Sequence, residues 1–471
     1  MTQSNNRSQL TLWALDGAEQ VNPAEPSQER APSSAQTGSN LRPPKATGLW
    51  DKAFSPANLQ RALQRVVANR GAPGVDGIEV KQLASDFETI WPETRRSLDE
   101  GTYRPCPVRR VEIPKPDGGV RELGVPTVLD RLIQQALLQV LVEVFDPLFS
   151  ESSFGFRPKR SAHMAVKAAQ RYVEEGNGWV VDIDLDRFFD RVNHDALMAR
   201  VARKVADKQV LKLIRRYLEA GVMAEGVKAE AEMGTPQGSP LSPLLANIML
   251  DDLDKEIERR GHRFVRYADD LRVYVKSERA AGRVQLGLTE FIEKRLKLRV
   301  NREKSGIAPA TKRGLLGFGF LRRKGKVDTR IDPKARKAML GRIRVLTART
   351  WGVSMNDRIT ALNRFIRGWC AYFALADTPS VFEQADEWLR RRLRQVSWKQ
   401  WKRPRNRARN LRALGIPKQK AYEWANSRRG SWRIAGSAPL ARALPNAYWR
   451  ELGLVGFKES YGRVRHVWRT A

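Results

Sequence analysis

The sequence contains few of the residues that build disulfide frameworks or zinc clusters. Its 471 residues include two cysteines, Cys106 and Cys370, and four histidines. These six residues lie far apart along the chain, so neither a disulfide scaffold nor a zinc site with the usual ligand spacing can be assembled from them. The scarcity of cysteine indicates a reducing compartment.

Long apolar runs are also missing from the sequence. No run approaches the roughly 18 residues of a membrane span, and the polar start MTQSNNRSQ lacks a secretory apolar segment. We therefore expect a cytoplasmic protein with no membrane partner. Association with the nucleoid is compatible with this location.

Acidic residues are scarce relative to basic ones. Asp and Glu number 52 against 85 Lys and Arg, which gives a formal net charge of +33. Residues 311–471 carry +28 of this excess and nine of the thirteen tryptophans, whereas residues 1–310 carry only +5. Cations neutralise phosphates and aromatic faces stack on unpaired bases, so this mixture favours RNA or a single strand as partner. The alternative is that most of these tryptophans belong to a packed core.

The length predicts about three domains, and 41% hydrophobic residues exclude wholesale disorder. Residues 1–47 are expected to be a flexible leader because residues 14–47 are rich in Ala, Pro, Ser, Gln and Glu. Apolar spacing predicts a helix over 55–69, and a Pro-Asp-Gly-Gly turn predicts a hairpin over 108–126. Thr127 is expected to cap the helix that follows.

Two acidic segments coincide with predicted strand ends. The segment WVVDIDLDRFFD begins as a strand, with Asp184 near its C-terminal end. RFVRYADDLRVYV predicts a hairpin that places Asp269 and Asp270 at its turn. An adjacent pair of aspartates is usually a solvated turn, which is also our expectation for the run LDDLD at 250–254. A third carboxylate on a second strand end makes a site for two Mg²⁺ ions plausible.

Seven motifs occur in one order between residues 110 and 320: IPKPDGGVRELGVP, SFGFRPKRSAH, DIDLDRFFD, PQGSPLSPLLANIML, YADD, LRVNREKSGI and LGFGF. This series resembles the motif set of reverse transcriptases encoded by bacterial group II introns. The basic tail, with RFIRGWCAYF and LGIPKQKAYEWANSRRGSWRIAGSAPL, resembles the thumb and maturase region of that family with its DNA-binding extension. The resemblance covers roughly residues 50–460.

The resemblance implies an α/β (α+β) right-hand polymerase. Residues 48–325 would form fingers and palm around a small antiparallel sheet, residues 326–400 a helical thumb and maturase domain, and residues 401–471 a basic DNA- or RNA-binding extension. No HNH endonuclease is expected, because the tail after Arg403 has no cysteine and only His466.

The resemblance also implies catalytic residues and four ligands for two Mg²⁺ ions. The carboxylates of Asp184 and Asp269 match the catalytic pair, and Asp270 is their neighbour. Leu185 would offer its backbone carbonyl to the nucleotide-bound ion. Asp182 and Asp186 match no family position, and we expect them to be ordinary surface residues.

A further set of positions is implied to contact nucleotide and primer. Phe189 would exclude a ribose 2′-hydroxyl, although the residue alone is equally compatible with a core phenylalanine. Lys304 would protonate the leaving pyrophosphate, although a solvated lysine is the alternative. Lys115 and Arg121 would hold the triphosphate. Gln237 and Gly238 would follow the template base. Tyr267, Gly317 and Phe318 would contact the primer.

The implied reaction is DNA synthesis from dNTPs on an RNA template with a DNA primer. The implied partners are the parent group II intron RNA, whose splicing and mobility the chain would assist, and target DNA, with a homodimer also compatible. One alternative is a splicing maturase with little polymerase activity, and another is a related group II-like reverse transcriptase with a different role. An RNA polymerase is disfavoured by Phe189, and a two-metal nuclease would not need the fingers hairpin.

The charge distribution predicts where salt sensitivity resides. Affinity for structured RNA should fall steeply with salt, by about 0.7–0.9 log units per phosphate contact per log unit of salt. Residues after 310 should supply most of that slope, because they carry +28 of the net charge. Filter binding across a salt series, with the full chain and with residues 48–320 alone, measures it. An equal slope for both proteins would contradict the prediction.

Overall fold

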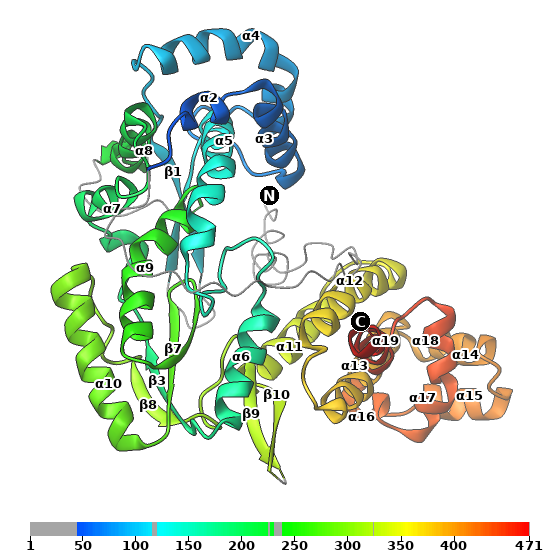
Figure 1. Ribbon diagram of the computed structural model, residues 1–471. Helices are drawn as coiled ribbons and strands as arrows, with labels where there is room; N and C mark the ends of the chain where they lie inside the picture. The colour runs from blue at the N-terminus through cyan, green and yellow to red at the C-terminus, as the bar shows by residue number, and fades with distance from the viewer. Residues whose placement is uncertain (1–44, 115–119, 225–226, 230–237, 324, 471) are drawn as a thin grey trace. The chain divides into compact units, whose positions relative to one another are not determined.

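The computed structural model describes most of the chain, in five stretches: residues 45–114, 120–224, 227–229, 238–323 and 325–470. These residues form two compact units, one that runs to Ala310 and one that begins at Thr311. Each unit has its own secondary structure and its own buried side chains (Figure 1).

The first unit contains a four-stranded antiparallel sheet in the order β6–β7–β3–β8. Helix α6 (Ala162–Glu174) contacts β6, and helix α10 (Glu278–Phe291) contacts β3 and β8 (Figure 1). The central strand β3 is buried almost throughout, as expected for a strand covered by helices. The four strands are β3 (Trp179–Ile183), β6 (Arg263–Tyr267), β7 (Asp270–Val275) and β8 (Gly306–Pro309).

A second sheet of the first unit has the order β2–β1–β4–β5. Strands β1 and β2 form the hairpin predicted over 108–126, which is confirmed; the tip at residues 115–119 lies outside the described residues. Strand β1 also pairs in parallel with β4, which the sequence did not indicate. The strands are β1 (Val108–Pro114), β2 (Val120–Val125), β4 (Val222–Ala224) and β5 (Val227–Ala229).

Helix α5 is central to the core of the first unit and contacts α2, α3, α4 and α9. The hydroxyl of Thr127 accepts a hydrogen bond from the Asp130 amide, so the predicted N-cap is confirmed. The predicted helix over 55–69 is confirmed as α3. The other helical segments of this unit have the bounds α2 (Leu49–Ala53), α3 (Pro56–Asn69), α4 (Val80–Asp99), α5 (Val128–Phe145), η1 (Asp146–Leu148), η2 (Phe188–Arg191), α7 (His194–Val201), α8 (Lys208–Glu219), α9 (Ser242–Arg259) and η3 (Ile292–Leu296).

The second unit is a hairpin followed by helices. Helix α19 contacts both α12 and α13, which makes these three helices the centre of the unit. No helix within the described residues is both long and apolar enough to cross a membrane. The elements are β9 (Phe318–Arg323), β10 (Lys326–Ile331), α11 (Pro333–Leu346), α12 (Met355–Phe373), α13 (Pro379–Gln400), α14 (Pro404–Ala413), α15 (Lys418–Ala425), α16 (Ser431–Ala435), α17 (Ala438–Ala443), α18 (Asn446–Glu451) and α19 (Phe457–Thr470).

The tryptophans of the second unit are mostly not deep core residues. Trp398 and Trp449 are buried and Trp432 is exposed, while the other five with described side chains are half-buried. The core interpretation therefore holds fully for only two of these eight. Half-buried rings at a basic surface keep the stacking interpretation open.

The two cysteines lie in different environments. Cys106 is exposed just before β1, whereas Cys370 is buried on α12 and its Sγ donates to the Phe457 carbonyl at 3.4 Å. Both thiols are free, in agreement with the expectation of no disulfide.

Candidate active site

Asp184 follows the last residue of the central strand β3, and its backbone is held on both sides. The Asp184 amide donates to the Ser305 hydroxyl at 3.0 Å, and the Asn301 amide donates to the Asp184 carbonyl at 2.9 Å. Ser305 also donates to that carbonyl at 3.4 Å. The loop from Asn301 to Ser305 is thus fixed beside Asp184, and sequence reasoning did not identify either of these two clamping residues.

The YADD segment forms the β6–β7 turn, as predicted. Tyr267 pairs with Asp270, and between them Ala268 adopts a left-handed backbone with φ 59°. Strands β3 and β7 are antiparallel, and Ile183 lies opposite Leu271. The next residue along β3, Asp184, is therefore placed beside Asp270. The structure therefore brings together the three carboxylates that the sequence singled out, from two strand ends.

The Asp270 carboxyl is half-buried and lies among other carboxylates. Burial raises the pKa of Asp270 to about 7, and the negative charges of Asp269 and Asp184 contribute in the same direction. Arg272 lies two residues after Asp270 on β7, and its Nη2 is 3.3 Å from Asp270 Oδ1. The negative charges of Asp184 and Asp269 next to Asp270 suit divalent cations.

Arg272 also pairs with Asp182, which corrects one expectation. Asp182 was expected to be an ordinary surface residue, but it is buried on β3, directly opposite Arg272 in the strand register. Asp186 is partly exposed and pairs with Arg191 at 3.0 Å. The position of Asp182 within the segment WVVDID was the available signal. A central strand that is covered on both faces buries the side chains of both faces.

A buried ion pair lies next to the YADD turn. The Arg266 guanidinium, on β6, donates to both Asp254 oxygens at 2.7 and 2.5 Å. Its third nitrogen donates to Asn247 Oδ1 at 2.8 Å and to the Ala268 carbonyl at 3.0 Å. Arg266 thereby ties the left-handed residue of the turn to helix α9.

The same pair corrects the expectation for the run LDDLD. These residues lie on helix α9 and not in a solvated turn, and Asp254 is completely buried. The helical spacing of Leu250, Leu253 and Ile257 was the available signal, because it continues the apolar face of the preceding segment.

Gly155, in the motif SFGF, packs against the turn itself. A Cβ at this position would lie 2.3 Å from the Ala268 amide nitrogen, so only glycine fits. Neighbouring residues bond to β6, with the Arg266 amide donating to the Ser152 carbonyl at 2.9 Å. The SFGF motif therefore has a structural role, because it supports the turn that carries Asp269.

Three further predicted residues lie near Asp184 in the fold. No described donor bonds to the carbonyl oxygen of Leu185, which leaves it available as a ligand. Phe189 is buried in the core against Phe188, with ring centroids 5.1 Å apart. Lys304 is exposed in the Asn301–Ser305 loop, where its amide donates to Asn301 Oδ1 at 3.2 Å.

The predicted triphosphate and template residues are only partly described. Lys115 and Gln237 lie outside the described residues, and for Arg121 the structure gives the backbone alone, on β2 opposite Ile113. Gly238 has φ 114°, and a Cβ there would lie 2.9 Å from the Gly124 carbonyl of β2. The loop before α9 thus reaches the hairpin strand that carries Arg121.

The predicted primer residues fall in both units. Tyr267 ends β6, and its ring centroid lies 6.5 Å from that of Phe156. Gly317 has φ 81°, and Phe318 is fully buried against Phe373 in the second unit. Phe318 therefore acts there as a core residue, so any primer contact at this position must come from the backbone.

The residues at the strand ends fit a divalent cation in chemistry, although they do not form a finished cage. Among the described residues, no three acidic, histidine or cysteine side chains converge into a complete metal cluster. The donors that fit are carboxylate and carbonyl oxygens, which are the ligands that Mg²⁺ prefers; it usually completes its shell with water and substrate phosphates. The accumulation of negative charge around Asp270 supports the same conclusion.

The small antiparallel sheet, the fingers-like hairpin and the paired strand-end aspartates define a right-hand polymerase. Residues 113–320 match the family model "Reverse transcriptase (RNA-dependent DNA polymerase)", and residues 336–415 match "Group II intron, maturase-specific domain". Protein YkfC of Escherichia coli (strain K12) is 31% identical over 352 residues, which cover 64% of this chain and 91% of YkfC. The chain belongs to the family of group II intron-encoded reverse transcriptases that carry a maturase domain.

Other relatives are similar over shorter spans. Group II intron-encoded protein LtrA of Lactococcus lactis subsp. cremoris is 30% identical over 362 residues, which cover 60% of this chain and 59% of LtrA. Among solved structures, a chain of a partial Cas6-RT-Cas1–Cas2 complex has a TM-score of 0.35 at 24% identity, covering 53% of this chain and 43% of that one.

The buried ion pair beside the turn predicts a large stability effect. Asp254→Asn should lower the free energy of unfolding of the first unit by about 3–5 kcal/mol, because it leaves the Arg266 guanidinium buried without its counter-charge. Urea unfolding followed by circular dichroism measures it. Glu290→Gln is the control, since the Glu290–Lys294 pair on the same unit is exposed and should contribute little to the free energy of unfolding. Equal effects of the two substitutions would refute this assignment.

Proposed function

We propose that this chain is an RNA-directed DNA polymerase that also binds its group II intron RNA and assists the splicing and mobility of that intron. The observation that carries the proposal is the meeting of Asp184 with the Asp269–Asp270 turn at a half-buried, negatively charged point of the antiparallel sheet. The maturase-specific match over residues 336–415 supports the intron RNA as partner. An RNA template with a DNA primer, dNTPs and target DNA complete the proposed partners, and a homodimer is compatible with them.

In the proposed reaction the primer 3′-hydroxyl attacks the α-phosphate of a dNTP. The 3′-hydroxyl loses its proton to solvent, the new bond joins the 3′-oxygen to that phosphorus, the bond from the phosphorus to the bridging oxygen of the β-phosphate breaks, and pyrophosphate leaves. Two Mg²⁺ ions would supply charge neutralisation at the attacking and leaving oxygens. The carboxylates of Asp184, Asp269 and Asp270 and the Leu185 carbonyl would hold them.

The other residues of the chain would orient the reactants. Lys115 and Arg121 would hold the triphosphate oxygens, and Lys304 would give a proton to the leaving pyrophosphate. The Asn301–Ser305 loop supports this role for Lys304, because that loop is bonded to the backbone of Asp184. Gln237 and Gly238 would follow the template base.

The division of labour along the chain is part of the proposal. Residues 48–325 would act as fingers and palm, residues 326–400 as thumb and maturase domain, and residues 401–471 as a basic extension for DNA or RNA, after a leader of 47 residues. Tyr267, Gly317 and Phe318 would lie along the primer. The net charge of +28 after residue 310 supports nucleic acid as the partner of that region.

Asp269→Asn separates the two activities. It preserves size but removes a negative charge that the cations need, so primer extension should fall by several orders of magnitude. Intron RNA binding and protein-assisted splicing should continue near the wild-type level, because they depend on the basic surface. Parallel assays of extension and splicing on purified protein measure both.

Asp186→Asn is the matched control for that substitution. Asp186 lies two residues after Asp184 and pairs with Arg191, outside the carboxylate cluster, so extension should persist. If Asp269→Asn also abolished splicing in a folded protein, the two activities would not be separable as proposed. If wild-type protein assisted splicing without extending primers, the chain would be a maturase with little polymerase activity.

Phe189→Ala should admit ribonucleotides, because the ring beneath the sugar would no longer overlap a 2′-hydroxyl. The ratio of kcat/KM for dNTP over rNTP should fall at least 10-fold in primer extension. Phe188→Ala is the control, since Phe188 is equally buried and lies in the same core. Both variants should lose stability through the cavity they create, but only Phe189→Ala should change the ratio. An unchanged ratio would remove Phe189 from this role.

A further inference from the structure

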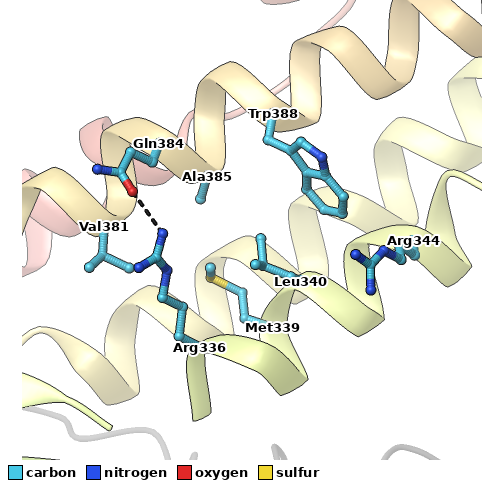
Figure 2. Close-up of a pocket in the computed structure, with 8 residues that line it drawn as sticks. All are labelled: Arg336, Met339, Leu340, Arg344, Val381, Gln384, Ala385 and Trp388. Atoms are coloured by element: carbon cyan, nitrogen blue, oxygen red, sulfur yellow. Dashed lines mark hydrogen bonds between the residues drawn. The ribbon is translucent and has the colours of Figure 1, made fainter. Parts of the chain in front are cut away.

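A groove lies between helices α11 and α13 of the second unit (Figure 2). Its floor is apolar, with Met339 and Ala385 buried, and arginines stand on its rim. Its volume is about 220 Å³, below the roughly 300–1,000 Å³ of sites that enclose a drug-sized ligand. The groove therefore suits one flat group that remains attached to a larger molecule outside.

Two arginines, Arg336 and Arg344, line the groove, and Arg392 lies beside it, near the Trp388 ring. Among the described residues, none of the three has a carboxylate partner. Arg336 donates to the neutral amide of Gln384 at 2.7 Å. Arg392 donates to the Thr347 hydroxyl at 2.9 Å and to the carbonyls of Arg344 and Thr347 at 3.2 Å, so its guanidinium is held in place by neutral groups. Burial and the positive charges of Arg344 and Arg349 lower the pKa of Arg392. A cluster of like charges without acids favours an anionic ligand.

Trp388 is the aromatic wall of the groove. The guanidinium carbons of Arg344 and Arg392 each lie 5.6 Å from its ring centroid. Closer cation–π pairs occur elsewhere in the unit, at 4.0 Å for Arg391 on Trp432 and at 4.5 Å for Arg407 on Trp398. Trp388 is thus oriented by two cations near the 6 Å limit of such contacts and is not closely capped by either.

An apolar slot, an indole face and unneutralised guanidinium groups together match a nucleotide. A base in a duplex is covered on both faces by its neighbours, whereas an unpaired base can stack on an aromatic side chain. We propose that the α11–α13 groove binds one unpaired nucleotide of an RNA strand, with its base against Trp388 and the flanking phosphates at Arg336, Arg344 and Arg392. This inference rests on the proposed function in that the strand is taken to be an unpaired segment of the intron RNA.

Substitution of Trp388 in the full chain tests the stacking. The probe is a fluorescein-labelled 12-nucleotide oligouridylate, and binding is followed by anisotropy. Trp388→Leu should weaken binding about 10-fold, within the range for loss of one base–aromatic stack, while Trp388→Phe should stay within about 3-fold of wild type. Trp432→Leu is the matched control, because Trp432 is exposed beside an arginine outside the groove. A 12-base-pair RNA duplex should bind wild type and Trp388→Leu equally.

The arginines are tested through the salt dependence of the same probe. The double substitution Arg344→Gln with Arg392→Gln should reduce the slope of log affinity against log salt by about 1.4, since each lost phosphate contact on a single strand accounts for about 0.7. Arg463→Gln is the control, because Glu459 already neutralises Arg463 at 2.9 Å. A 4-thiouridine in the centre of the probe should crosslink on irradiation to residues of α11 or α13 in wild-type protein.

The outcomes distinguish this inference from the proposed function. If wild type binds the probe and the Leu and double-Gln variants bind it with unchanged affinity and slope, the groove is not the site, although intron binding can still stand. Crosslinks confined to other segments would overturn the groove in the same way. If wild-type protein binds neither the probe nor intron RNA, both the groove and the proposed partner are wrong. The crosslink uses unaltered protein, so it decides the matter even if Trp388→Leu fails to fold.

Discussion

Mutual repulsion of Asp184, Asp269 and Asp270 is the constraint around which the first unit is organised. Holding three carboxylates at two strand ends is unfavourable, because the charges of Asp184 and Asp269 raise the cost of ionising Asp270. The backbone supplies the resistance, through the register of β3 with β7 and through Ser305 and Asn301 at Asp184. The β3–β7 ladder and the Asn301 bond join main-chain atoms and do not depend on a rotamer, whereas the Ser305 bond is made by its side-chain hydroxyl.

The YADD turn is supported from a different direction. Its left-handed residue, Ala268, is stabilised by the Arg266 guanidinium and is contacted by Gly155. Arg266 reaches it only because Asp254, deep in α9, neutralises the buried charge. The buried Arg266 guanidinium thus holds the turn that carries Asp269 in place. It joins helix α9, strand β6 and the YADD turn.

Much of this arrangement could be predicted from sequence. Alternation and turn residues located Asp184 at a strand end and the Asp269–Asp270 pair in a hairpin, while the resemblance to reverse transcriptases gave the fold. The burial of Asp182 was missed, because Arg272, the cation that pairs with it, lies opposite it on another strand. Asp254 was missed because acidic residues are rarely buried, and its partner lies on a different element. Whether Phe189 is core or nucleotide contact was undecidable, since one ring can do both.

The structure also shows that not all of the positive charge counted in the sequence faces solvent. In the second unit several arginines bond to backbone carbonyls: Arg358 donates to the Leu346 carbonyl at 2.6 Å, and Arg394 to the Leu444 carbonyl at 3.3 Å. Such residues act as helix-end caps and are partly withdrawn from solvent. Part of the +28 is therefore structural, and Arg392 shows that one residue can serve as a cap and also lie near the ring of Trp388.

The contrast between the two thiols has a practical consequence for following the molecule in motion. Cys370 is shielded in the core of the second unit, whereas Cys106 is accessible at the start of β1, the strand that pairs with the one carrying Arg121. Partial burial and the nearby Asp130 raise the pKa of the Cys106 thiol, so its reaction is slowed, and a near-neutral buffer keeps the lysine amines protonated and unreactive. A maleimide dye would then attach to the natural chain at one position, and its emission would report on movements of the hairpin sheet without any engineered residue.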